Sequence, residues 1–169
     1  MMTMKERLYA SMICWEGWQF VAVSSRKGAC YIDLCGTPLT ELSHELHSTV
    51  VPDDYHNLSI LQELREYLAG QRRSFSSPFY TQGTPFQRSV WGAVLEIPYG
   101  ETCSYGDIAA AIGRPLAARA VGGALSANPL PIIVPCHRVI GTNGKLVGFG
   151  GGLALKERLL ALEQGSLDL

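Results

Sequence analysis

Hydrophobic and polar positions along the first half of the chain predict a β-hairpin followed by an amphipathic helix. Residues 19–23 and 29–34 are rich in β-favouring side chains, and they flank the turn-forming segment 24–28. Apolar side chains then recur at helical spacing over residues 57–69, and Gly70 stands where a helix end favours glycine. The pattern therefore predicts a small α/β unit.

The composition changes after this helix. Residues 71–83 are rich in Arg, Ser, Pro and Gln and predict an extended connection, so we place a domain boundary after residue 82. Thr84, Pro85 and Gln87 then form a capping-box pattern with a proline at the first helical position. A helix is expected to begin there.

Two more short helices are expected in the second half. Ser104 opens a second capping-box pattern for a helix that Gly113 ends, and Pro115 is expected to open another helix that runs towards Asn128. Two short helices joined by a tight turn are typical of a helix-turn-helix pair. The same pattern also fits a simple helical corner.

The remainder of the chain alternates irregular segments with one helix. The apolar run 130–135 is flanked by prolines and predicts a short strand that leads directly into Cys136. Glycines at 148–152 predict a mobile or closely approached loop, and helical spacing predicts a final helix over 153–163. The second half is therefore expected to be mostly helical.

Composition narrows the class of protein. The chain has 169 residues, of which 47% are hydrophobic and 17% charged, as expected of a soluble protein with room for two small domains. No apolar run approaches the roughly 18 residues of a membrane span, and no signal-peptide pattern is present, so a cytoplasmic protein is expected. The formal net charge of -1 argues mildly against a nucleic-acid partner. Any DNA binding must use a local patch.

The five cysteines predict free thiols and no metal site, because their number is odd and none forms a CxxC pair. Cys136 is followed directly by His137 and Arg138, and a nucleophilic cysteine needs a base or a positive neighbour. Adjacent side chains on a strand point to opposite faces, so a contact between Cys136 and His137 is not guaranteed. The alternative is a buried structural cysteine beside a histidine that satisfies a backbone group.

Four motifs follow one another between residues 84 and 163. They are Ile97-Pro98-Tyr99-Gly100 with Ser104-Tyr105, residues 118–124 followed by Asn128-Pro129, residues 133–140 around Cys136, and Gly148-Phe149 leading into Gly151-Gly152-Leu153. In this order they resemble the motifs of the methylated-DNA–protein-cysteine methyltransferases, also called O6-alkylguanine-DNA alkyltransferases. The first half resembles the family in its length, in its hairpin and helix, and in residues 75–79.

The resemblance implies the direct repair of O6-alkylguanine, and more weakly of O4-alkylthymine, by one irreversible transfer of the alkyl group to Cys136. It implies that His137 deprotonates the cysteine through a water and that Glu163 orients the histidine, as in a catalytic triad. Tyr105 would donate a proton to the base, and Asn128 would hold the active-site turn. From the residues alone, Glu163 also fits a solvated position in a last helical turn, and Tyr105 a packing role.

The same resemblance implies a double-stranded DNA partner, bound in the minor groove with the damaged base rotated out of the duplex. Arg119 would fill the space that the base leaves, although the small residues around it also suit close helix packing. Further DNA contacts are implied for Ser104, Tyr105, Ala120 and Gly122. The pocket for the alkylated base would be lined by Pro131, Val134, Val147, Phe149 and Gly150.

The fold that the resemblance implies is a ribonuclease-H-like α/β domain over residues 1–82 and a mostly helical domain with a winged-helix-like helix-turn-helix over residues 83–169. No cofactor or metal is expected, and the protein is expected to be a monomer. Two alternatives remain. One is a non-enzymatic DNA-binding sensor of alkyl damage, whose relatives lack the acceptor cysteine. The other is a thiol hydrolase with a Cys-His pair, which turns over repeatedly and requires no DNA.

Overall fold

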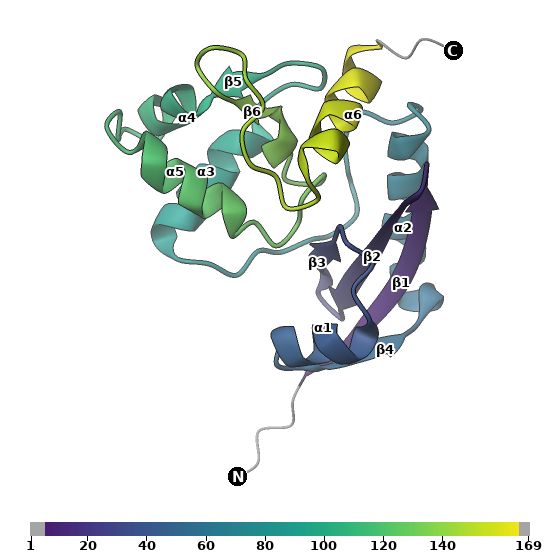
Figure 1. Ribbon diagram of the computed structural model, residues 1–169. Coiled ribbons are helices and arrows are strands. Elements are labelled where there is room, and N and C mark those ends of the chain that lie inside the picture. The colour runs from purple at the N-terminus through teal and green to yellow at the C-terminus, as the bar shows by residue number, and fades with distance from the viewer. Residues whose placement is uncertain (1–5, 166–169) are drawn as a thin grey trace. The chain divides into compact units, whose positions relative to one another are not determined.

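The computed structural model describes residues 6–165 and divides the chain into two compact units, Met1–Tyr80 and Thr81–Leu169. The first unit combines a four-stranded mixed sheet with helices, and the second is mostly helical with a two-stranded sheet (Figure 1). The change in composition after residue 82 lies close to this division. The predicted combination of an α/β unit with a mostly helical one is confirmed at this level.

The first unit has the strand order β3-β2-β1-β4, with β4 parallel to β1 and the other neighbours antiparallel. Its elements are β1 (Arg7–Trp15), β2 (Trp18–Ser25), β3 (Gly28–Asp33), α1 (Leu39–Glu45), β4 (Thr49–Pro52) and α2 (Asp54–Leu68). The predicted hairpin is confirmed as β2 and β3, and the predicted helix as α2. Helix α2 begins earlier than expected because the Asp53 side chain caps it, accepting hydrogen bonds from the backbone of Tyr55 and His56.

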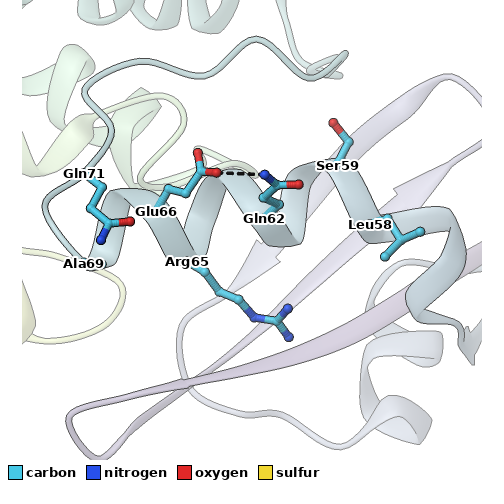
Figure 2. A pocket seen from close by; sticks show the side chains of 7 residues that line it. All are labelled: Leu58, Ser59, Gln62, Arg65, Glu66, Ala69 and Gln71. Atoms are coloured by element: carbon cyan, nitrogen blue, oxygen red, sulfur yellow. Dashed lines mark hydrogen bonds between the residues drawn. The ribbon is translucent and has the colours of Figure 1, made fainter.

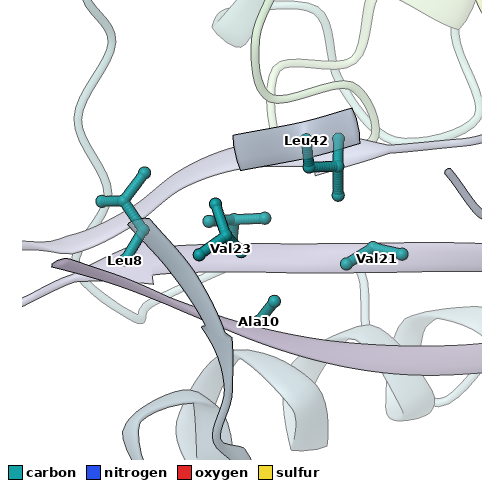
Figure 3. Close-up of a cluster of buried hydrophobic side chains, with 6 residues drawn as sticks. Leu8, Ala10, Val21, Val23 and Leu42 are labelled. Carbon is teal, nitrogen blue, oxygen red and sulfur yellow. The ribbon is translucent and has the colours of Figure 1, made fainter. Parts of the chain in front are cut away.

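The two helices of this unit take opposite faces of the sheet, because side chains alternate along a strand. Leu8 and Ala10 of β1 join the core under α1, where they pack with Leu42 (Figure 3). Between them in sequence, Tyr9 stacks on His56 of α2 with ring centroids 3.7 Å apart. The strand is therefore buried on both faces, which fixes its place inside the sheet.

The second unit is built by local signals that the sequence carries. Its elements are α3 (Pro85–Leu95), β5 (Cys103–Ser104), α4 (Tyr105–Ala111), α5 (Ala118–Ser126), the 3-10 helix η1 (Cys136–Arg138), β6 (Val139–Ile140) and α6 (Leu153–Gln164). Both predicted capping boxes form, at Thr84 and at Ser104. The indole N–H of Trp91 donates to the Ala124 carbonyl oxygen at 2.9 Å and so ties α3 to α5.

The predicted start of α5 at Pro115 is wrong. The helix begins at Ala118, because the backbone N–H of Ala117 donates to the Arg114 carbonyl oxygen at 2.9 Å and closes a turn around Pro115. Proline fixes the backbone angle that such a turn requires. The turn leaves the Leu116 side chain fully exposed.

The predicted strand at 130–135 is also wrong, and the segment forms a buried turn. Ile132 takes a positive φ of 75°, and the backbone N–H of Val134 donates to the Leu130 carbonyl oxygen at 2.8 Å. The prolines in this segment lack the N–H groups that a strand ladder needs, so its apolar side chains are buried by a turn instead. Cys136 and His137 consequently lie on a 3-10 helix and not on a strand.

Candidate active site

Cys136 begins the 3-10 helix η1 directly behind the buried turn, and only 8% of its surface is exposed. The Asn128 side chain makes three contacts with this turn and with the cysteine. Its side-chain amide donates to the Val134 carbonyl oxygen at 3.0 Å and approaches the Cys136 Sγ at 3.3 Å. Its side-chain oxygen accepts from the backbone N–H of Leu130 at 3.0 Å. The Asn128 side chain therefore connects the turn directly to the sulfur.

The environment of Cys136 favours the neutral thiol at rest. Burial raises the pKa of the Cys136 thiol above its ordinary value, while the Asn128 amide and the positive charge of Lys156 act in the opposite direction. A buried thiol that keeps its proton reacts slowly as a nucleophile. For this sulfur to react as a nucleophile, a base must therefore lie close by.

His137, the next residue on η1, can act as a base because it is fully buried and neutral. Burial lowers the pKa of its imidazole, and this effect outweighs the carboxylate of Glu163, which raises the pKa. The His137 Nε2 lies 2.8 Å from the Glu163 Oε1. A carboxylate accepts hydrogen bonds, so Nε2 carries the ring proton and Nδ1 keeps the lone pair that can take up another.

Glu163 connects the histidine to the rest of the site. Its carboxylate accepts two hydrogen bonds from Arg138, at 2.8 Å from Nε and 2.9 Å from the second terminal nitrogen, and one from the Gly100 backbone at 3.2 Å. Arg138 also donates to the Ile97 carbonyl oxygen at 2.7 Å. The Glu163 side chain is completely buried, so the solvated position considered for it is wrong.

The motif at Ile97–Gly100 therefore belongs to the site, which residue types alone did not indicate. Gly100 has a positive φ of 82°, and a Cβ atom there would lie 3.1 Å from the Glu163 carbonyl oxygen. Glycine permits both the turn and the close approach. The Arg138 guanidinium lies 5.7 Å from the centre of the Tyr99 ring, so the motif supports both members of the Arg138–Glu163 pair.

Lys156 is another part of the site that the sequence analysis did not identify. Its side chain is fully buried, and its ammonium donates to the carbonyl oxygens of Val139 at 2.6 Å and Val147 at 3.0 Å. Burial lowers the pKa of this ammonium. The missed signal is helical spacing, because Lys156 and Glu163 are seven residues apart and therefore share the buried face of α6.

Tyr105 lies at the first turn of α4, and its hydroxyl donates to the Val147 carbonyl oxygen at 2.9 Å. Burial, and then the negative charge that Cys136 carries as a thiolate, raise the pKa of Tyr105. The hydroxyl therefore keeps its proton and lies within electrostatic reach of the sulfur. The Val147 carbonyl oxygen accepts from this group, although half of the surface of Val147 is exposed.

The residues predicted to line the base pocket differ in their surroundings. Pro131 and Val134 are buried and face each other in a β-bridge across the turn. Phe149 is half-buried, with its ring 6.4 Å from the His137 ring in an edge-on arrangement. Gly150 is exposed. The structure thus brings Phe149 next to the histidine and places Gly150 at the surface.

The residues predicted to contact DNA lie on or beside α5. Arg119 and Ala120 are exposed, and a Cβ atom at Gly122 would meet the Tyr105 ring at 3.8 Å. Ser104 differs, because its hydroxyl is engaged by Asp107 in the capping box. Tyr105 and Gly122 are therefore brought together, and Arg119 lies on the same helix as Gly122, whereas the Ser104 hydroxyl caps the start of α4.

Within residues 6–165, no group of three or more His, Cys, Asp or Glu side chains could hold a metal ion, and no helix is long and apolar enough to cross a membrane. An open hollow follows the outer face of α2 and contains the Gln62–Glu66 hydrogen bond (Figure 2). None of the predicted site residues lines it.

A cysteine held in a buried turn, followed by a neutral histidine that is hydrogen-bonded to a carboxylate, is the arrangement expected of proteins that use cysteine as a nucleophile. The family model described as the DNA-binding domain of 6-O-methylguanine DNA methyltransferase matches residues 85–165. The inducible methylated-DNA–protein-cysteine methyltransferase of Bacillus subtilis is 44% identical to this chain, over 97% of this chain and 94% of that protein. The chain therefore belongs to the methylated-DNA–protein-cysteine methyltransferase family, as its four motifs predict.

Two further matches agree with this assignment. A methylated-DNA–protein-cysteine methyltransferase of Methanosarcina acetivorans is 58% identical over 60% of this chain and 65% of its own length. The crystal structure of Mycobacterium tuberculosis OGT in complex with DNA superposes with a TM-score of 0.82 at 39% identity, covering 94% of this chain and 93% of that one. The resemblance therefore extends over both units.

Proposed function

We propose that this protein repairs alkylated DNA by transferring the alkyl group of O6-alkylguanine, and less readily of O4-alkylthymine, to its own Cys136. The observation that carries the proposal is the buried Cys136 in its clamped turn, beside a neutral His137 that is held by Glu163. Membership of the methyltransferase family supports the same activity. In this proposal residues 83–169 form the DNA-binding and alkyl-acceptor domain.

The proposed reaction is a direct displacement at the alkyl carbon. The thiol proton moves through a water to His137 Nδ1, and the imidazolium that forms is stabilised by Glu163. The sulfur then forms the new S–C bond while the bond from that carbon to guanine O6 breaks. Tyr105 donates to the base as charge develops on it. The guanine gains one proton, and the proton that His137 took from the thiol returns to Tyr105 through solvent, so one proton passes in total from the thiol to the guanine. The reaction needs no metal or cofactor.

The product explains why one molecule would act once. S-alkylcysteine is a thioether, which has no activated bond for water to attack. The protein is therefore consumed in a single turnover. This outcome distinguishes the proposal from a thiol hydrolase, whose acyl-enzyme intermediate is readily cleaved by water.

DNA binding in this proposal uses the second unit, and the charge distribution supports it. No Asp or Glu occurs between Ile108 and Lys156, a stretch that includes the exposed Arg114, Arg119 and Lys145. A local positive surface binds phosphates even when the net charge of the whole protein is -1. The crystal structure of Mycobacterium tuberculosis OGT in complex with DNA also covers this unit.

The geometry of binding follows from the chemistry. A base in the duplex keeps its O6 substituent away from a buried sulfur, so the nucleotide must rotate out of the helix. We assign the filling of the vacated space to Arg119, with α5 in the minor groove and contacts from Ser104, Tyr105, Ala120 and Gly122. We assign the pocket for the rotated base to Pro131, Val134, Val147, Phe149 and Gly150.

The proposal also covers the fold of each unit, the oligomeric state and the cellular compartment. We propose a ribonuclease-H-like arrangement for the first unit and a winged-helix-like arrangement around α4 and α5 in the second. We also propose that the protein acts as a monomer in the cytoplasm, where a reducing compartment keeps Cys136 a thiol. A non-enzymatic sensor is disfavoured, because the acceptor cysteine and its base are both present.

Intact-protein mass spectrometry tests the proposal. The protein is incubated with a duplex that contains one O6-methylguanine, and the adduct is mapped by peptide mass spectrometry. We expect a gain of one methylene group on Cys136, absent from Cys136→Ala and retained in Cys103→Ala. Binding of the duplex without a mass change would support the non-enzymatic sensor instead. The absence of both binding and a mass change would favour the thiol hydrolase.

A further inference from the structure

The carbonyl oxygen of Val147 accepts hydrogen bonds from two side chains of the site. The Tyr105 hydroxyl donates to it at 2.9 Å and the Lys156 ammonium at 3.0 Å. These donors come from α4 and α6, while Val147 lies in the loop between β6 and α6. One backbone oxygen thus joins both helices to the loop that contributes residues to the proposed base pocket.

Lys156 is an unusual donor for this position. A buried ammonium is strongly unfavourable unless its surroundings compensate for the lost hydration. Its two hydrogen bonds go to the carbonyl oxygens of Val139 and Val147, and no salt bridge joins it to a carboxylate within residues 6–165. The side chain therefore fixes the backbone on both sides of the loop 141–146.

Tyr105 faces a conflict in the proposed reaction, on which this inference rests. A tyrosine hydroxyl has one proton to donate, and in this structure it is donated to Val147. To donate to an alkylated base, Tyr105 must release the Val147 carbonyl. The entering base also excludes water from this region, so a carbonyl without a donor there would be unfavourable.

We propose that the Val147 carbonyl is the resting acceptor of the Tyr105 hydroxyl, and that Lys156 is a positioning residue that holds this carbonyl when Tyr105 turns to the base. Lys156 lowers the free energy of that exchange because the carbonyl keeps one donor throughout. It also keeps Val147 in place while the base enters. Lys156 acts through Tyr105 and the loop and does not touch the base.

This role differs from two simpler ones. A lysine that only supports the fold lowers the transfer rate equally, whether or not Tyr105 has its hydroxyl. A lysine that acts only through its charge on Cys136 does the same. The proposed role instead makes the effect of Lys156 depend on the Tyr105 hydroxyl, because only that hydroxyl leaves the carbonyl during the reaction.

A double-mutant cycle tests this dependence. Single-turnover transfer from an O6-methylguanine duplex is measured for the wild type, Lys156→Met, Tyr105→Phe and the double variant, and the second-order rate constant is compared. With Tyr105 present, Lys156→Met should lower this constant about tenfold, as expected for a carbonyl left without a donor once the base has excluded water. In the Tyr105→Phe background the same change should lower it by less than about twofold.

The controls separate this inference from the proposed function. Lys27→Met, at an exposed turn of the first unit, should leave the rate constant unchanged. The unfolding midpoint of each variant is measured first, and Lys156→Gln replaces Lys156→Met in the cycle if the latter does not fold. Equal losses in both backgrounds overturn the role given to Lys156, whereas a wild type that transfers no methyl group overturns the proposed function itself.

Discussion

At the residue scale, the site depends on one carboxylate that serves three groups. The two oxygens of Glu163 accept hydrogen bonds from His137, Arg138 and the Gly100 backbone. The shared arrangement neutralises the buried guanidinium and fixes the imidazole at the same time. Its disruption should therefore affect folding and reactivity together.

Glu163→Gln should show both effects. A buried ion pair that loses one partner costs ~3 kcal/mol or more, because the Arg138 charge stays behind without compensation. The transfer rate should fall about 100-fold, since the base is no longer oriented or balanced by charge. Chemical denaturation and single-turnover assays measure these changes. Glu157→Gln, at an exposed position of the same helix, is the control, and equal stability of the two variants would contradict this account.

The pKa of His137 makes stability depend on pH. Burial lowers this pKa below its ordinary value of 6.5, so the unfolded chain binds the proton at a higher pH than the folded one. As pH falls below about 6.5, the unfolded state gains the proton first, and the free energy of unfolding should decrease by up to ~1.4 kcal/mol per pH unit. Above that pH the contribution is fully present.

Denaturant unfolding between pH 7.5 and 5.5 checks this expectation. The decrease in the free energy of unfolding should be steeper in the wild type than in His137→Gln, whose side chain does not titrate. Parallel curves for the two proteins would show that His137 is not buried in its neutral form. The comparison removes the contribution of the exposed histidines, which both proteins share.

Single residues also show what sequence could predict and what it could not. Cys136 and His137 stand out because they are adjacent and chemically reactive. Lys156 and Arg138 do not, because their importance comes from the carbonyls and the carboxylate that the fold brings to them. Helical spacing places Glu163 on the same face of α6 as Lys156, but the burial of that polar face depends on the partners that the fold brings to it.

At the element scale, local signals determine the helices and fail at the turn. The capping boxes at Thr84 and Ser104 form as predicted, because each is complete within four residues. Apolar character at 130–135 predicts a strand, but the prolines there cannot donate to a ladder, and a turn results. That turn depends on Asn128 for its hydrogen bonds.

Asn128→Ala should therefore weaken both the turn and the acceptor. The Leu130 N–H and the Val134 carbonyl lose their side-chain partner, which should lower the free energy of unfolding by ~2 kcal/mol. The pKa of Cys136 should rise further, because the amide beside its sulfur favours the thiolate. Urea denaturation and the pH dependence of the transfer rate measure these effects.

Asn143→Ala provides the comparison for the stability measurement. The side chain of Asn143 also accepts a hydrogen bond from the backbone N–H two residues ahead, but its turn is exposed. Its substitution should change the free energy of unfolding by less than about 0.5 kcal/mol. If Asn143→Ala lowered the free energy of unfolding as much as Asn128→Ala, the contacts of Asn128 would contribute no more than those of an ordinary exposed turn.

At the scale of the whole molecule, average properties such as net charge do not show how charges and strands are distributed along the chain. A net charge of -1 argues against DNA, yet residues 108–156 contain no acidic side chain. The mixed sheet of the first unit was predicted only in part, because β1 is buried on both faces and lacks the alternation that identifies a half-exposed strand. Strand β4 and helix α1 are short, and their places depend on pairing with β1 and on burial against the sheet.

The central claim is that each molecule accepts one alkyl group on Cys136, and a titration tests it most directly. A fixed amount of protein is incubated with increasing excess of O6-methylguanine duplex, and the restored guanine is counted. We predict a plateau at one guanine per protein molecule, reached together with complete methylation of Cys136. Continued repair beyond that value, or a plateau without methylated Cys136, would contradict this account.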